Sequence, residues 1–140
     1  MKKFQTMMAV VLVALMAFAV QSCGSDNNDD SQRYTIELSL KIDQPGNLSQ
    51  EDCQLLINQT KQKSAASDRA DDNVARQATA YAADAIAEAF RKDAEAGLYG
   101  DAVMTCTIEC KRVSNQERVD IWYVTYDKGV ITKSNGRNAQ

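Results

Sequence analysis

Four cysteines are the most chemically distinctive residues of this chain: Cys23, Cys53, Cys106 and Cys110. A thiol can be acylated, can form a disulfide, can bind a soft metal ion or can pack as a small apolar group. Histidine, the commonest general base and a frequent zinc ligand, is absent from the 140 residues. The chemistry open to the chain therefore depends on the elements that hold each cysteine.

Cys23 follows an apolar segment that has the anatomy of an export signal. Lys2 and Lys3 give a positive start, residues 7–20 form an uninterrupted apolar run, and Ser22 is a small residue directly before the cysteine. The run is shorter than the roughly 20 apolar residues that a membrane-spanning helix needs. These features predict a cleavable signal peptide over residues 1–22.

The end of this signal, Val20-Gln21-Ser22-Cys23, resembles the lipobox of bacterial lipoprotein precursors. Val20 and Ser22 fit the family pattern, whereas Gln21 is bulkier and more polar than the usual middle residue. The resemblance implies that the Cys23 thiol is diacylated, that the signal is cleaved before it, and that the new N-terminus is acylated. Two or more acyl chains anchor a protein stably, so the implied partner is a membrane. The alternative is an ordinary secretory signal with an incidental cysteine.

The segment after Cys23 has no apolar residue as far as Gln32, which predicts a flexible tether. Its acidic run also resembles the signal that follows the cysteine in surface-exported lipoproteins of some Gram-negative bacteria. The residues that would carry such a signal are Ser25, Asp26, Asp29 and Asp30. This resemblance implies an outer membrane lipoprotein displayed on the cell surface, and the alternative is a solvated spacer.

The rest of the chain is long enough for one domain and too short for two. We expect a signal at 1–22, the lipidated cysteine and tether at 23–32, a single domain at 33–132 and a frayed tail at 133–140. Without Lys2 and Lys3 the mature chain is acidic and lacks a basic run. Nucleic acid is therefore not an expected partner.

Periodicity predicts an α+β fold of the order β-α-α-β-β. Apolar residues alternate with polar ones from Tyr34 to Ile42, as in a half-buried strand. The expected elements are a strand at 33–42, a helix that Ser49 begins, a helix at 68–96, strands at 102–113 and 118–127, and a short pairing at 130–132. They would form an antiparallel sheet of three or four strands with two helices on one face.

Cys106 and Cys110 share the inward face of the second long strand with Met104 and Ile108. Four residues of strand separate the two thiols by about 13 Å, too far for a mutual disulfide. Cys53 lies on the buried stripe of the first helix. A bridge from Cys53 to one of them and three buried free thiols are the two alternatives, and neither a thiolate metal site nor a cofactor is expected.

The outward face of the sheet should be polar except at the third long strand, where Trp122, Val124 and Tyr126 interrupt it. Large apolar residues on a wet face have two explanations. One is that residues 130–132 or a second copy of the protein cover them. The other makes them a candidate contact site, because tryptophan and tyrosine are enriched at binding hot spots.

These features favour a non-catalytic binding or accessory module that recognises a protein or a glycan on the cell envelope. A structural subunit of an envelope complex is the alternative, followed by an enzyme with an acidic site such as Glu109 and Glu117. Asp68, Asp71 and Asp72 could bind a hard cation. Acidic residues at a helix N-terminus more commonly interact with the helix dipole, so no metal site is expected.

Overall fold

The structure, a computed structural model, describes residues 33–62, 65–66 and 71–136. The signal, Cys23 and the acidic run between Ser25 and Asp30 lie outside the described residues, and so does Asp68. Predictions that concern them are therefore not tested by the fold.

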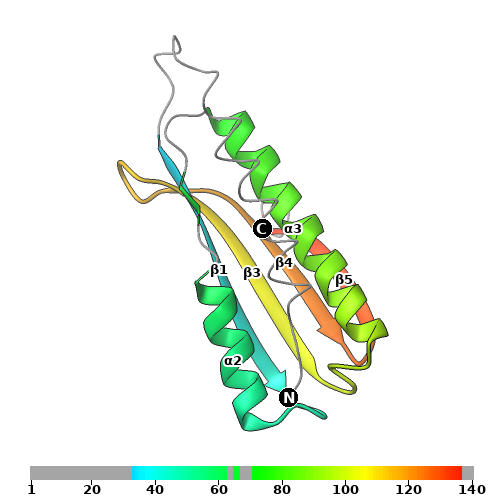
Figure 1. The fold of residues 1–140 in the computed structure, drawn as a ribbon. Helices are drawn as coiled ribbons and strands as arrows, with labels where there is room; N and C mark the ends of the chain where they lie inside the picture. Colours follow the sequence, from blue (N-terminus) through cyan, green and yellow to red (C-terminus); the bar gives the residue numbers. More distant parts are fainter. Residues whose placement is uncertain (1–32, 63–64, 67–70, 137–140) are drawn as a thin grey trace.

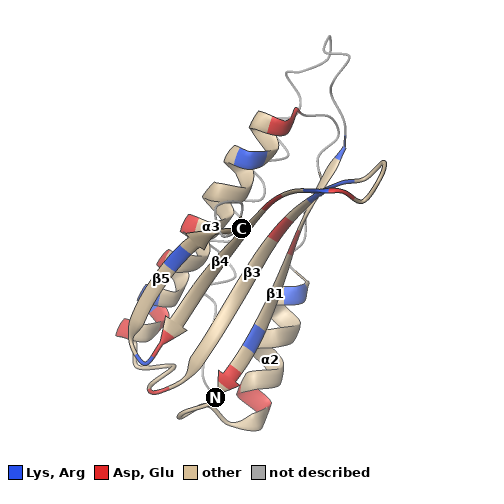
Figure 2. Ribbon diagram, turned by 180° about the vertical axis from the view of Figure 1, so that it is seen from behind, with Lys and Arg blue, Asp and Glu red and all other residues tan. Residues whose placement is uncertain are grey.

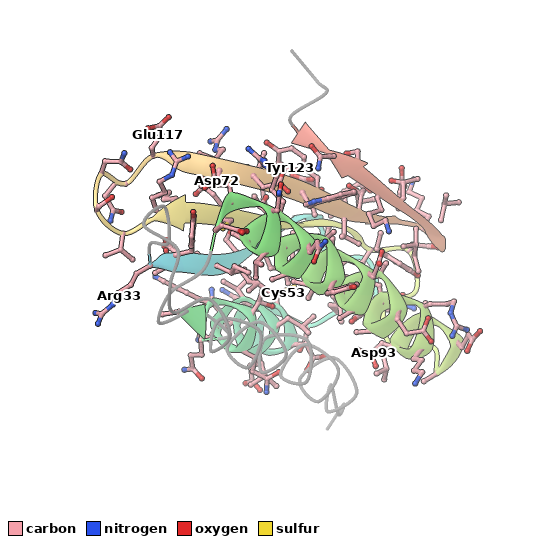
Figure 3. All side chains as sticks on the ribbon, turned by 90° about the horizontal axis from the view of Figure 1, so that it is seen from above. Arg33, Cys53, Asp72, Asp93, Glu117 and Tyr123 are labelled. Atoms are coloured by element: carbon pink, nitrogen blue, oxygen red, sulfur yellow. The ribbon has the colours of Figure 1, made fainter. Side chains whose placement is uncertain are left out.

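The described chain forms one antiparallel sheet with two helices on the same face (Figures 1 and 3). In chain order the elements are β1 (Tyr34–Gln44), α2 (Gln50–Lys61), β2 (Ala65–Ala66), α3 (Asp72–Glu95), β3 (Val103–Arg112), β4 (Arg118–Asp127) and β5 (Val130–Asn135). The strand order is β2-β1-β3-β4-β5. This arrangement confirms the predicted α+β class and the antiparallel pairing of the first two long strands.

Three elements differ from the sequence prediction. Ala65 and Ala66 form a two-residue strand on the outer edge of β1, too short to leave a periodic pattern. The last strand continues to Asn135, because β5 pairs with β4 along its whole length, so residues 133–135 belong to the sheet and not to a frayed tail. Helix α3 begins at Asp72, four residues later than expected, because Asp71 caps it.

The core lies between the sheet and the helices. Alternate residues of β1 are buried on this side, and β3 adds a second buried row that includes both of its cysteines. The buried residues of the two strands are Tyr34, Ile36, Leu38, Leu40, Met104, Cys106, Ile108 and Cys110. Since directly opposed residues of antiparallel strands share a face, the pairing of Ile36 with Cys110 and of Leu40 with Cys106 makes one continuous apolar surface.

Side-chain caps fix the starts of both helices, and a glycine follows the end of α3. The Ser49 hydroxyl accepts a hydrogen bond from the Asp52 backbone N–H (3.0 Å) at the start of α2, as its sequence predicts. The Asp71 carboxylate accepts one from the Val74 N–H (2.8 Å) at the start of α3. At its end, Gly97 adopts φ +76°, a conformation that glycine tolerates, and the chain turns towards β3.

Three loops meet at the end of the sheet where α3 terminates. The backbone of Gly46, in the β1–α2 turn at φ +54°, lies directly against the backbone of Asp101 and Ala102. The Lys128 N–H, in the β4–β5 turn, donates a hydrogen bond to the Ala102 carbonyl oxygen (3.1 Å). The segment before β3 is therefore held between two turns that are remote from each other in the sequence.

Neither α2 nor α3, the helices of the described residues, has both the length and the apolar character needed to cross a membrane.

Candidate functional site

The three described cysteines are free thiols, which is one of the two alternatives that the sequence leaves open. Cys106 and Cys110 are fully buried, as predicted, and Cys53 is half-buried against the core. Burial raises the pKa of the Cys106 thiol to about 12 and that of the Cys110 thiol to about 11. Both thiols remain protonated at neutral pH and act as small apolar groups.

The predicted contact patch was placed on the wrong face of the sheet. Ile108 of β3 pairs with Trp122, Cys106 with Val124 and Met104 with Tyr126. Opposed residues share a face, so all three point towards the helices. Val124 and Tyr126 are buried, and Trp122 is half-buried against the same core. These residues stabilise the domain and do not form an exposed binding surface.

Which residues of β4 point towards the helices depends on the register of the β3–β4 hairpin. A bulge at Cys110 and Lys111 shifts that register. A signal for the correct face is nevertheless present in the sequence. Thr125 and Asp127 alternate with Val124 and Tyr126, and polar residues at the end of a half-buried strand mark its wet face. Ile121, the apolar exception on that wet face, is covered by the backbone of Gly136.

A partly buried network joins the start of α3 to the sheet. The Tyr34 hydroxyl donates a hydrogen bond to Asp72 Oδ1 (2.5 Å), and Arg112 Nη2 donates one to Asp72 Oδ2 (2.7 Å). Arg112 Nη1 also lies 3.3 Å from the Glu117 carboxylate. These contacts tie β1, β3 and α3 together and use Asp72 as a structural partner. Over the described ranges, no group of three or more metal-ligating side chains comes together.

Two aspartates that lie near opposite ends of α3 (Figure 3) should contribute to stability with opposite dependence on pH. Burial raises the pKa of Asp93, and the hydrogen bond from the Tyr99 hydroxyl offsets it only in part. Burial also acts to raise the pKa of Asp72, but the hydrogen bonds from Tyr34 and Arg112 outweigh it and leave that pKa low. A carboxyl group whose pKa is raised by folding stabilises the folded state at pH values below its unfolded pKa, and this stabilisation is lost as pH rises through the folded pKa. A carboxyl group whose pKa is lowered by folding stabilises the folded state above its unfolded pKa, and this stabilisation is lost as pH falls through the folded pKa.

We therefore expect Asp93→Asn to become more stable relative to wild type as pH rises from about 4 to about 7, because its raised pKa lies in that direction. Asp72→Asn should become less stable relative to wild type as pH rises from about 2 to about 4, because the pKa of Asp72 is lowered. Urea unfolding of the three proteins at about pH 2, 4 and 7 measures the two trends. Parallel trends for the two variants would contradict the assigned directions of the pKa shifts.

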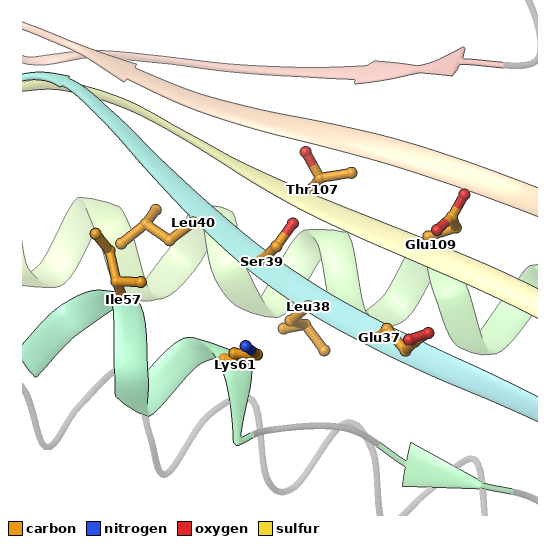
Figure 4. Close-up of a pocket in the computed structure, with 8 residues that line it drawn as sticks. All are labelled: Glu37, Leu38, Ser39, Leu40, Ile57, Lys61, Thr107 and Glu109. Carbon is orange, nitrogen blue, oxygen red and sulfur yellow. The ribbon is translucent and has the colours of Figure 1, made fainter. Parts of the chain in front are cut away.

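A hollow of about 440 Å³ lies beside β1, between the end of α2 and the open face of the sheet (Figure 4). We name it the β1 hollow. Its lining residues are Glu37, Leu38, Ser39, Leu40, Ile57, Lys61, Thr107 and Glu109. The hydroxyls of Ser39 and Thr107 and the carboxylate of Glu109 point away from α2, whereas Ile57 and Lys61 come from that helix. The volume falls within the range of small-ligand sites in proteins.

The charged groups at the β1 hollow are the carboxylates of Glu37 and Glu109 and three cationic side chains, Lys61, Lys111 and Arg118. Glu37 of β1 pairs directly with Glu109 of β3, so two carboxylates face each other across neighbouring strands. Glu109 forms ion pairs with Arg118 (2.8 Å) and Lys111 (3.5 Å). Among the described residues Glu37 has no ion pair, and its side chain is exposed. Like charges in opposed positions destabilise a sheet, and the two ion pairs of Glu109 offset its repulsion from Glu37.

The chemistry of the β1 hollow is that of recognition. Carboxylate and hydroxyl oxygens accept hydrogen bonds, and the hydroxyls of Ser39 and Thr107 also donate them. The apolar lining residues Leu38 and Leu40 are buried in the core. Sequence reasoning assigned Glu37, Ser39, Thr107 and Glu109 to a polar outward face, and their alternation with buried residues confirms it (Figure 2). It did not identify the hollow, because Ile57 and Lys61 reach it from a helix whose position only the fold gives.

The other carboxylate pair considered from the sequence is not joined by any shared contact in the structure. Glu109 forms ion pairs with Arg118 and Lys111, and Glu117 lies in the β3–β4 turn beside Arg112.

Comparisons of the chain with models of protein families, with curated proteins and with solved structures find no match.

Proposed function

We propose that this chain is a bacterial lipoprotein, anchored to the outer membrane of a Gram-negative bacterium by acyl chains on Cys23. The observation that carries the proposal is Val20-Gln21-Ser22-Cys23 directly after the apolar run of residues 7–20. The fold supports a special role for Cys23, because Cys106 and Cys110 are buried and Cys53 packs against the core. Acylation of Cys23 would attach the domain through the tether, which leads directly into β1.

The domain on this anchor is proposed to be a non-catalytic binding or accessory module. Support comes from the open face of the sheet and the β1 hollow, whose side chains offer hydrogen bonds. The half-buried Asp72 and the buried Asp93 are used to hold α3 in place. A module of this kind acts by holding a partner at the membrane surface.

Cys23→Ser should abolish lipid attachment, because serine lacks the thiol that is acylated. Metabolic labelling of the expressing bacterium with a fatty-acid analogue measures this, with Cys53→Ser as the matched control. We expect label on the wild type and on Cys53→Ser and none on Cys23→Ser, which should accumulate as uncleaved precursor or soluble protein. Absence of label on the wild type would refute the lipoprotein proposal.

The acidic run from Asp26 to Asp30 is proposed to direct the protein to the cell surface, and this can be tested in the same bacterial cells. Replacing Asp26, Asp29 and Asp30 with alanine should leave the acyl label intact and remove the domain from protease added to whole cells. If the wild type already resists protease, or if the alanine variant remains accessible, the run is a spacer and the lipid anchor stands alone.

A further inference from the structure

We propose that the outer edge of β5 pairs with the same edge of a second copy of this chain, so that two sheets join into one across a two-fold axis. The inference goes beyond the proposed binding function. One step of it, the confinement of the copies to a membrane, rests on the proposed anchor at Cys23. It begins from the strand order, in which β5 is the last strand on its side of the sheet.

The edge of β5 offers backbone hydrogen bonds that no described strand takes up. The β4–β5 turn has two residues, both with positive φ, and Asp127 pairs with Val130 across it. In such a hairpin the residues on either side of the turn form the first hydrogen-bonded pair, and the two kinds of pair then alternate along the strands. The backbone N–H and C=O groups of Ile131 and Lys133 therefore point outward.

The features that usually protect a sheet edge are missing from β5 or turned inward. The strand has no proline and no bulge in its pairing with β4. Its one charged residue, Lys133, forms an ion pair with Asp84 of α3 and lies 5.5 Å from the centroid of the Trp122 ring, so its charge is held over the helix side of the sheet. The opposite edge differs, because β2 pairs with β1 there and α2 reaches the hollow beside it.

Two exposed apolar side chains flank this edge. Val130, the first residue of β5, is 62% exposed, and Tyr81 of α3 is 51% exposed. Tyr81 lies on the side of α3 that faces β5, because Asp84, one turn further along the helix, pairs with Lys133. A second copy at the edge would cover both side chains.

The sequence of β5 fits a copy of itself in one register. Opposed residues share a face, so two joined sheets with their helices on the same side require an axis that passes through a residue. An axis at Thr132 pairs residues 130–134 and places the aliphatic stem of Lys133 against Ile131 of the second copy. These two residues are also the ones whose backbone groups point outward. An axis at Lys133 would oppose two ammonium groups, and an axis nearer either end would pair fewer residues.

The helices leave room for this pairing. Helix α3 packs chiefly on β4, the strand next to β5 (Figure 3). Three strand spacings, roughly 14 Å, would separate β4 from β4 of the second copy, whereas packed helices lie about 8–10 Å apart. The two α3 helices would therefore not clash, and the Tyr81 side chains would project into the gap. Pairing of one short edge is a small interface, and confinement of anchored copies to a membrane favours it by raising their effective concentration.

The test is disulfide cross-linking of the intact protein in the expressing bacterium, followed by non-reducing electrophoresis. Thr132→Cys should give a covalent dimer, because opposed residues of antiparallel strands lie about 4.5–5.5 Å apart between Cα atoms, within the reach of a disulfide. Ser134→Cys, exposed on the same face of the same strand, is the matched control. The register would hold its two copies roughly 14 Å apart, so we expect at least about tenfold less dimer. Ser39→Cys, exposed on β1, should also stay monomeric.

A second pair of variants tests the same register with Thr132 left in place. Cells that produce both Val130→Cys and Ser134→Cys should give the mixed dimer, because these residues oppose each other across the axis. No dimer from either Thr132→Cys or the mixed pair would overturn the inference, and so would equal dimer from Ser39→Cys. A covalent product of Thr132→Cys with a different protein would overturn the assignment of the edge to a second copy.

Failure here is distinct from failure of the proposed function. A protein that carries the acyl label on Cys23 but gives no covalent dimer remains a lipoprotein, and its β5 edge stays unpaired. A protein without the label that still gives the Thr132→Cys dimer keeps the edge pairing and loses the anchor.

Discussion

Replacing Gly46 with alanine should lower the free energy of unfolding by about 2–4 kcal/mol. Two physical costs combine at this position. Gly46 adopts φ +54°, where a residue with a Cβ is strained, and its neighbours are backbone atoms that cannot rotate away. An added Cβ would lie 2.6 Å from the carbonyl carbon of Asp101 and 2.9 Å from the Cα of Ala102. The β1–α2 turn and the segment before β3 would have to separate.

Gly97→Ala is the matched control for this prediction. Gly97 also has a positive φ, +76°, but an added Cβ there would meet nothing within 4 Å. It should lose only the conformational cost, about 1 kcal/mol. Urea unfolding of both variants beside the wild type separates strain from steric clash. If the two variants lose equal stability, the close contact between the two loops is absent in solution.

The long strands, the Ser49 cap and the end of α3 could be predicted because their signals are local. The alternation from Tyr34 to Ile42 encodes one buried face, Ser49 needs only the next turn of chain to act as a cap, and Gly97 ends α3 through its own conformation. Such features depend on a few neighbouring residues and are visible in one sequence. The buried position of Cys106 followed in the same way from the alternation within its strand.

Features that depend on how elements meet could not be predicted in this way. The face of Trp122 depends on its pairing with Ile108, which the β3–β4 turn and a bulge determine. The β1 hollow requires Glu37 to oppose Glu109 and Lys61 to reach it from α2. The two-residue strand β2 forms through the pairing of Ala65 and Ala66 with the edge of β1. Each of these is a tertiary contact between segments that the sequence separates.

Phe90→Ala should destabilise the domain by about 3–5 kcal/mol, a large share of the total stability of a domain of this size. Phe90 is fully buried on α3, and its ring packs edge-on against Tyr99 at 5.8 Å and Tyr126 at 6.5 Å between centroids. Truncation would leave a cavity between α3 and β4 and would remove both aromatic contacts. The two tyrosines cannot collapse into it freely, because the Tyr99 hydroxyl bonds to Asp93 and the Tyr126 hydroxyl to the Gly100 carbonyl.

Tyr81→Ala is the control on the same helix, because Tyr81 is an aromatic residue of α3 whose side chain is 51% exposed. Its loss should change stability by no more than about 0.5 kcal/mol, as for other surface substitutions. Thermal and urea unfolding of both variants give the comparison, and near-ultraviolet circular dichroism reports the tyrosine environment directly. A Phe90→Ala protein as stable as Tyr81→Ala would mean that α3 does not pack on β4 through this cluster, and the buried position of Tyr126 would then need another explanation.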